Sequence, residues 1–132
     1  MIDPAGNLYV ADRANSRIRK ITAKGAVTTL AGGEQGFRDG QGSNARFWSP
    51  SSIAIDAAGN LYVADRANDH IRKVTPQGKV TTLTDSEKGL AESRESATQF
   101  RSLSSIVIDT TGNLYVADTG NHRICKIEIR RP

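Results

Sequence analysis

DAAGNLYVAD, residues 56–65, is the stretch that decides the fold of this chain, because it recurs along the sequence. Closely matching copies occupy residues 3–12 and 109–118, which gives a period of 53 residues. Residues 3–30 and 56–83 are identical at 21 of 28 positions without a gap. A period of this length is typical of stacked supersecondary units, so the repeat constrains the architecture before any local propensity does.

Within one period, short strand signals alternate with turn signals, as in a four-stranded antiparallel sheet. In the middle copy, strands are predicted at residues 52–56, 61–64, 70–75 and 79–83. Turn residues rich in Gly, Asn and Pro separate these strands. Residues 61–64 are all apolar or amphipathic, which predicts that both faces of the sheet are buried. The predicted fold class is therefore all-β, with four-stranded antiparallel units stacked face to face.

Long segments connect one unit to the next. Ala31–Pro50 holds five glycines in 20 residues and is expected to be a loop with little regular structure. Its counterpart Thr84–Leu103 is poorer in glycine, and residues 92–100 are compatible with a helical turn or two. Phe47 and Phe100 occupy the same place in the period, so we expect each segment to return to the core through one aromatic side chain.

Composition narrows the classes of function. Lys and Arg number 18 against 14 Asp and Glu, a net charge of +4 that can attract anions without requiring a nucleic acid. Apolar runs extend over only a few residues, so we expect no membrane-spanning helix and no membrane partner. The sequence does not open with a basic segment followed by an apolar run, so no secretory signal is expected in it. The single cysteine, Cys125, rules out an internal disulfide and a cysteine-based zinc site.

With the strands placed, Asn121-His122-Arg123-Ile124 resembles the motif of NHL-repeat β-propellers, a family named for Asn-His-Leu. Looser copies stand at residues 15–18 and 68–71, and Thr-Leu-Ala-Gly-Gly at 29–33 is similar to a segment of bacterial members with long repeats. The resemblance implies a six-bladed propeller built from four-stranded blades. It also implies a secreted or periplasmic location if the bacterial likeness holds.

The chain carries about two and a half blades in one segment, with blades at approximately residues 1–50, 51–103 and 104–132. A closed propeller needs roughly four to eight blades. Two interpretations follow. The chain is a piece of a longer propeller, or it is a homo-oligomer, a dimer in which three blade positions from each copy fill a six-position ring.

Residues with catalytic or metal-binding chemistry are few. The repeated aspartates recur in every copy, which favours turn capping over a calcium site. His70 and His122 lie at non-equivalent places in the period, which argues against the zinc site that the resemblance to propeller lyases would require. No Gly-x-Ser-x-Gly elbow occurs. We therefore expect no catalytic residue, no metal and no cofactor, and a protein that is not an enzyme.

The predicted function is a scaffold that binds a protein or a small ligand through its inter-blade loops, Ala31–Pro50 and Thr84–Leu103. The candidate binding residues are Phe37, Arg38, Asp39, Arg46 and Trp48.

An RNA-binding propeller is the alternative, because the resemblance includes animal regulators that bind single-stranded RNA. It would use the cations that recur with the period: Arg13, Arg17, Arg19, Arg66, Arg72 and Arg123. Few aromatic side chains are available to stack on bases, and arginine stems that cover blade edges would recur in the same way. A metal-assisted hydrolase or lyase is the second alternative.

Overall fold

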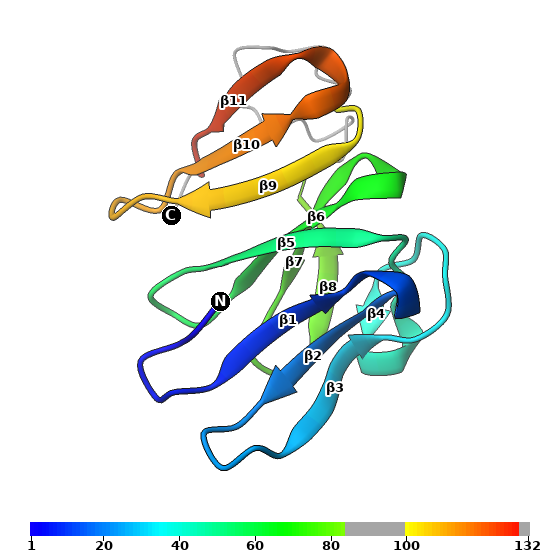
Figure 1. Ribbon diagram of the computed structural model, residues 1–132, viewed down its shortest axis with the longest axis vertical. Coiled ribbons are helices and arrows are strands. Elements are labelled where there is room, and N and C mark those ends of the chain that lie inside the picture. The colour runs from blue at the N-terminus through cyan, green and yellow to red at the C-terminus, as the bar shows by residue number, and fades with distance from the viewer. Residues whose placement is uncertain (84–99, 130–132) are drawn as a thin grey trace.

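The computed structural model describes residues 1–83 and 100–129, which form three antiparallel sheets stacked as layers (Figure 1). Throughout these two ranges the regular elements are β-strands and short 3-10 turns, with no α-helix. The all-β antiparallel prediction is confirmed. No helix in the described part of the chain has the length and apolar character needed to cross a membrane.

The first sheet, β1-β2-β3, contains one three-stranded repeat unit. Its strands are β1 (Leu8–Asp12), β2 (Arg17–Ile21) and β3 (Val27–Gly32). A 3-10 turn, η1 (Arg13–Asn15), joins β1 to β2. Ile2 adds an antiparallel bridge to Leu8, so the start of the chain lies beside β1.

The middle sheet confirms all four strands predicted for the middle copy. They are β5 (Pro50–Ile55), β6 (Leu61–Asp65), β7 (His70–Val74) and β8 (Lys79–Thr82). The turn η3 (Arg66–Asn68) joins β6 to β7. Each neighbour pairs antiparallel, as expected for strands joined by tight turns.

A fifth strand joins this sheet from the connecting segment that was expected to have little regular structure. β4 (Gly40–Gln41) pairs with the outer edge of β8, and the turn η2 (Gly42–Asn44) follows it. The side chain of Gln41 and the N–H of Gly42 donate to the carbonyls of Gln77 and Gly78. Apart from this short strand and turn the segment has little regular structure, as predicted. The strand was not predicted, because the local sequence of the loop does not reveal the bonding partners on the edge of β8.

The third sheet, β11-β10-β9, repeats the pattern. Its strands are β9 (Leu103–Ile108), β10 (Leu114–Asp118) and β11 (Arg123–Ile127), with the turn η4 (Thr119–Asn121) between the last two. The expected helical turn at 92–100 falls, except for Phe100, outside the described residues.

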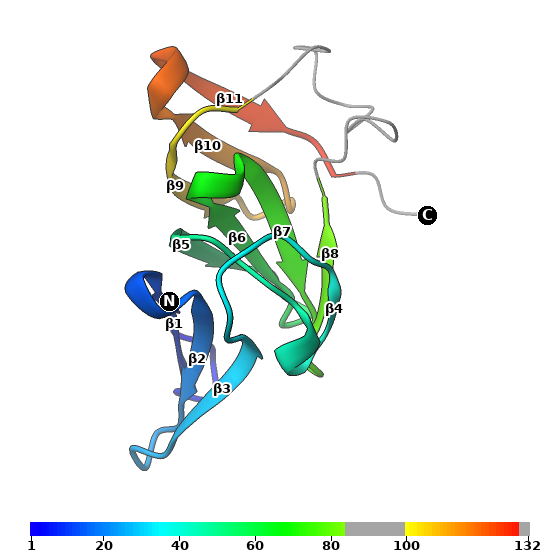
Figure 2. The same ribbon diagram turned by 90° about the vertical axis from the view of Figure 1, so that its right-hand side faces the viewer.

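Two apolar cores hold the three layers together, and the middle sheet contributes one face to each. Leu61, Val63 and Val74 pack against the first sheet, whereas Tyr62 and Ile71 pack against the third. This alternation follows from the period of two along a strand. The innermost strand β5 contacts β1 on one side and β9 on the other (Figures 1 and 2). The prediction that both faces of this sheet are buried is confirmed.

Phe47 and Phe100 both lie in these cores, each fully or almost fully buried. Phe47 belongs to the core between the first and middle sheets, and Phe100 to the core between the middle and third sheets. The predicted aromatic anchor at the end of each connecting segment is confirmed.

Candidate functional site

Arg72 lies at the centre of the candidate site, on β7, and its side chain has no exposed surface. Its guanidinium carbon is 4.8 Å from the ring centre of Phe37 and 4.9 Å from that of Phe47. Aromatic faces attract a cation electrostatically, and the attraction strengthens when water is excluded. The prediction that Arg72 contributes to an exposed basic surface is wrong, because it shares the inward face of β7 with Val74 and the loop before β5 closes over it.

The guanidinium of Arg72 binds the β3–β5 loop, residues 33–49, to the middle sheet. Nη1 donates to Oδ2 of Asp65 and to the carbonyl of Arg46, each at 2.8 Å. Nη2 donates to the carbonyl of Arg38 at 2.8 Å and to Oδ1 of Asp39 at 2.9 Å. Hydrogen bonds to a charged group are the stronger ones. One arginine therefore holds two separate stretches of the loop backbone.

Asp39 extends the attachment to the next strand. Its carboxylate accepts from the hydroxyl of Thr82 at 2.7 Å and from the N–H of Thr82 at 3.3 Å, in addition to its bond with Arg72. The loop is thereby attached to β7 and β8 together. Asp39, a predicted binding residue, already has its oxygens engaged within the protein.

Asp65 is the buried partner of Arg72. Burial raises the pKa of the Asp65 carboxyl, and hydrogen bonds from the Asn68 side chain, the Trp48 N–H and Arg72 oppose that rise. The Trp48 bond is 2.8 Å long and the Asn68 bond 2.7 Å. The carboxylate thus fastens the end of the loop to the β6–β7 turn while it neutralises the buried cation.

Three predicted binding residues present side chains to solvent on this fastened backbone. Phe37 is 51% exposed and Trp48 is 43% exposed, and Arg38 is exposed as well. The ring of Phe37 stacks on that of His70, with ring centres 5.0 Å apart. The Asn68 side chain donates to the carbonyl of Gly36, the residue before Phe37, at 2.8 Å. The N–H of Trp48 donates to Asp65, so the backbone at both aromatic residues is bonded to residues 65–68.

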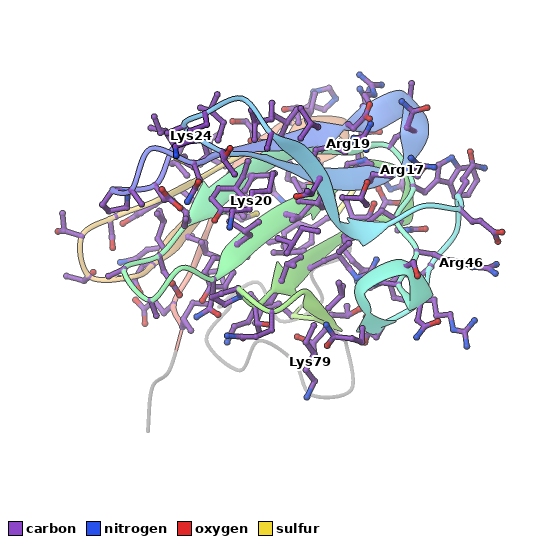
Figure 3. All side chains as sticks on the ribbon, turned by 90° about the horizontal axis from the view of Figure 1, so that it is seen from below. Arg17, Arg19, Lys20, Lys24, Arg46 and Lys79 are labelled. Atoms are coloured by element: carbon purple, nitrogen blue, oxygen red, sulfur yellow. The ribbon has the colours of Figure 1, made fainter. Side chains whose placement is uncertain are left out.

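Arg46, the last predicted loop residue, pairs at the surface with Glu34 at 2.9 Å. Its carbonyl belongs to the Arg72 attachment, while its side chain points outward (Figure 3). The exposed part of the loop therefore carries aromatic and cationic groups together.

The other recurring cations do not share one environment. Arg13 is exposed on η1 and Arg66 is partly buried on η3. Arg19 lies 3.4 Å from Asp12 and donates to Thr29, and Arg123 donates to Asp118 at 2.9 Å. Arg17 is half-buried on β2.

The labelled cations point in several directions around the molecule. In Figure 3, Lys79, Lys24 and Arg46 lie on different sides, and Arg17 and Arg19 lie on β2 apart from all three. A surface that attracts a nucleic-acid backbone would gather such groups on one face.

The aspartates before the Gly-Asn turns cap those turns, as the sequence predicts, but the capping prediction is wrong for Asp12, Asp65 and Asp118, whose side chains make no cap hydrogen bond to the 3-10 turns that follow them. Asp56 accepts the N–H groups of Ala58 and Asn60, and its other oxygen accepts the hydroxyl of Tyr62 at 3.0 Å. Asp3 and Asp109 make the equivalent bonds in the other two units.

A cavity of about 350 Å³ opens between the turns at residues 55–58 and 108–112. Its two carboxylates, Asp56 and Asp109, are occupied by their own turns. Within residues 1–83 and 100–129, no three His, Cys, Asp or Glu side chains gather as metal ligands would.

His70, Phe47, Asp65 and Asn68 were not predicted as parts of this site. They join it because residues 33–49 fold back over β6 and β7, which is a contact between segments distant in sequence. One signal was present: the alternation along β7 places Arg72 on the same face as Val74, and therefore in the core.

Three stacked antiparallel sheets joined through their inner strands are the architecture of consecutive β-propeller blades. The NHL repeat family model matches residues 47–74 and 100–127. The human NHL repeat-containing protein 2 is 38% identical over 136 residues, covering 92% of this chain. The chain belongs to the NHL-repeat β-propeller family.

Solved structures agree on the fold. An auxiliary nutrient binding protein from Bacteroides thetaiotaomicron matches 97% of this chain with a TM-score of 0.77 and 24% identity. A virginiamycin B lyase from Staphylococcus aureus matches all of it with a TM-score of 0.61 and 15% identity. The chain spans 19% of the human relative and 36% of the nutrient binding protein.

Proposed function

We propose that this chain is a non-enzymatic propeller scaffold that binds a protein segment on the exposed part of the β3–β5 loop. The observation that carries the proposal is how Arg72 holds the loop: it donates to two loop carbonyls, of Arg38 and Arg46, and to the Asp39 carboxylate, while Phe37, Arg38 and Trp48 stay accessible. A loop ordered before binding loses less conformational entropy when a partner docks.

The exposed groups indicate the kind of partner. Aromatic residues and arginine dominate the energetics of protein interfaces, and this loop presents Phe37, Trp48, Arg38 and Arg46. The net charge of +4 favours a partner with acidic side chains. A peptide segment that combines apolar and acidic residues matches this surface.

Panning of a displayed random-peptide library against the chain tests the proposal. We expect enriched peptides to contain apolar and acidic residues, and a fluorescently labelled peptide to bind the chain in anisotropy titrations. Trp48→Ala should weaken that peptide's affinity at least tenfold, the loss typical of a central aromatic contact. Lys79→Ala, an exposed change on β8, is the matched control and should leave the affinity unchanged.

Two results would overturn the proposal. One is enrichment of peptides whose affinity is the same for the wild type, Trp48→Ala and Arg38→Ala. The other is binding of a single-stranded RNA oligonucleotide, but of no peptide, with an affinity that falls steeply as salt rises. That salt dependence is the signature of phosphate contacts and would favour the RNA alternative.

A further inference from the structure

We infer that Arg38 and Arg46 form a clamp for a phosphorylated side chain, so that the partner of the β3–β5 loop is a phosphopeptide. This rests on the proposed function, because it names the anionic group that a peptide bound to this loop presents. The two arginines form an isolated antiparallel bridge. The N–H of Arg46 donates to the carbonyl of Arg38 at 2.8 Å, and the N–H of Arg38 donates to the carbonyl of Arg46 at 3.3 Å.

The bridge places the two arginine side chains next to each other. Residues directly opposite in an antiparallel pair project to the same face, with Cβ atoms about 4.5–5.5 Å apart. Ala45 and Phe47, on either side of Arg46, have no exposed surface. Successive side chains in extended backbone alternate between the two faces, so Arg46 and the opposite Arg38 project outward.

Arg72 fixes this pair from the inner side. Each of the two bridge carbonyls accepts a second hydrogen bond, at 2.8 Å, from the buried guanidinium of Arg72. The stem of Arg46 also lies against Gly36, where a Cβ would stand 3.2 Å from Cδ of Arg46. Groups held in place before binding lose less conformational entropy when a ligand docks. The backbone that carries both guanidinium groups is therefore ordered before the ligand arrives.

The charges on this pair are only partly neutralised within the described residues. Like charges directly opposite one another destabilise a strand pair, and the bridge itself uses only backbone groups. In residues 1–83 and 100–129 no acidic side chain pairs with Arg38, and the carboxylate of Asp39 is turned to Arg72 and β8. Glu34 pairs with Arg46 at 2.9 Å, but the Glu34 side chain is 77% exposed. An exposed pair of this kind is weak, so a ligand anion can displace Glu34.

Two adjacent guanidinium groups match a phosphoryl group better than a carboxylate. A carboxylate has one charge and is filled by the two parallel hydrogen bonds of a single arginine. A phosphorylated side chain has a charge of about −1.5 to −2 at pH 7 and three acceptor oxygens, so it can engage two arginines together. Phe37 and Trp48, exposed on the same loop, offer contacts to apolar side chains beside the phosphorylated one.

Peptide libraries with a fixed central phosphoserine, phosphothreonine or phosphotyrosine test this inference. The same libraries after phosphatase treatment provide the comparison. The sequence that binds best is then synthesised with and without its phosphate, and both forms are titrated against the chain by fluorescence anisotropy. We expect the phosphorylated form to bind at least tenfold more tightly, the gain typical of hydrogen bonds between charged groups.

Single substitutions assign the phosphate to the arginine pair. Arg38→Gln and Arg46→Gln should each weaken binding of the phosphopeptide at least tenfold and change that of the unphosphorylated form far less. Glu34→Gln should strengthen phosphopeptide binding by up to about fivefold, because it releases Arg46 from its exposed ion pair. Lys24→Gln removes the same charge on a different side of the molecule and should bind like the wild type (Figure 3).

These variants should keep the fold, which circular dichroism checks. The bridge and the bonds from Arg72 use backbone groups of residues 38 and 46, so the side-chain changes leave them in place.

Four results would overturn the phosphate clamp. A peptide that binds equally with and without its phosphate would do so while leaving the proposed peptide-binding function standing. Equal phosphopeptide affinities for the wild type, Arg38→Gln and Arg46→Gln would place the phosphate elsewhere. Binding of a single-stranded RNA oligonucleotide but of no phosphopeptide, lost in Arg38→Gln, would assign the pair to a nucleic-acid backbone. Absence of binding by every peptide, phosphorylated or not, would overturn the proposed function as well.

Discussion

Nη1 of Arg72 donates to Oδ2 of Asp65 across 2.8 Å, and neither side chain has exposed surface. The equivalent pair one period earlier, Arg19 and Asp12, is 3.4 Å apart, and both of its side chains are partly exposed. The β3–β5 loop closes over Arg72 and Asp65. One period earlier, the equivalent of that loop would precede residue 1, so the given sequence holds no counterpart of it beside Arg19 and Asp12.

Arg72→Met should lower the free energy of unfolding by about 3–5 kcal/mol, because it leaves the Asp65 carboxylate buried without its partner. Arg19→Met, the matched change in the first blade, should cost no more than about 1 kcal/mol, the range of exposed ion pairs. Urea unfolding at one fixed protein concentration measures both. Equal losses for the two variants would show that the loop does not shield Arg72 from water.

Tyr62 tests whether the repeated tyrosine supports blade packing. Tyr62→Ala should cost about 3–5 kcal/mol, since the ring is buried between the middle and third sheets. Tyr62→Phe keeps the ring and removes the hydroxyl that donates to Asp56, so a loss of about 1 kcal/mol is expected. Tyr115→Ala is the matched control, because Tyr115 is partly exposed and should cost less. A loss below about 0.5 kcal/mol for Tyr62→Ala would contradict its burial.

Alanine substitutions at Gly32 and Gly25 distinguish the cost of a left-handed backbone conformation from the cost of a steric clash. Both have φ of +89°, so alanine at either position should cost about 1 kcal/mol for the left-handed conformation. A Cβ on Gly32 would also stand 2.5 Å from the carbonyl oxygen of Ser16 and 2.9 Å from Phe47, whereas Gly25 has open space. Thermal or urea unfolding should therefore show Gly32→Ala as clearly the more destabilised variant. Similar stabilities would mean that β3 shifts to admit the methyl group.

The strands and turns could be predicted from the sequence because their determinants are local. Short apolar runs, Gly-Asn turns and an aspartate that caps each Gly-Asn turn recur within every period, and repetition removes the ambiguity that one copy would leave. The aspartate assigned to capping, Asp56, has the predicted turn contacts.

The environment of Arg72 could not be predicted in the same way, since its equivalents Arg19 and Cys125 occupy different surroundings. Its burial depends on Phe37 and Asp39, which lie more than thirty residues earlier on a glycine-rich loop. Strand β4 could not be predicted for the same reason. Two residues are too short a segment to show a strand pattern, and their conformation is determined by pairing with the edge of β8.

Asp109 allows a test of how the stability of the fold depends on pH under acidic conditions. The backbone N–H of Asn113 and the hydroxyl of Thr111 hold the pKa of the Asp109 carboxyl far below its usual range, and the Tyr115 hydroxyl adds to the effect. A carboxyl whose pKa is lower in the folded chain stabilises that state at any pH above its unfolded pKa of about 3.9. This stabilisation is lost as the pH falls through that value toward the lower folded pKa.

The unfolding free energy of the wild type should therefore decline between about pH 5 and pH 2.5. Asparagine has no carboxyl group to titrate, so the unfolding free energy of Asp109→Asn should decline less steeply than that of the wild type between about pH 5 and pH 2.5. Above pH 5, the unfolding free energy of this variant should change little with pH. Urea unfolding at a series of pH values measures both slopes. A slope for Asp109→Asn equal to that of the wild type would show that the carboxylate gains nothing from its turn, and that acid sensitivity arises at other aspartates.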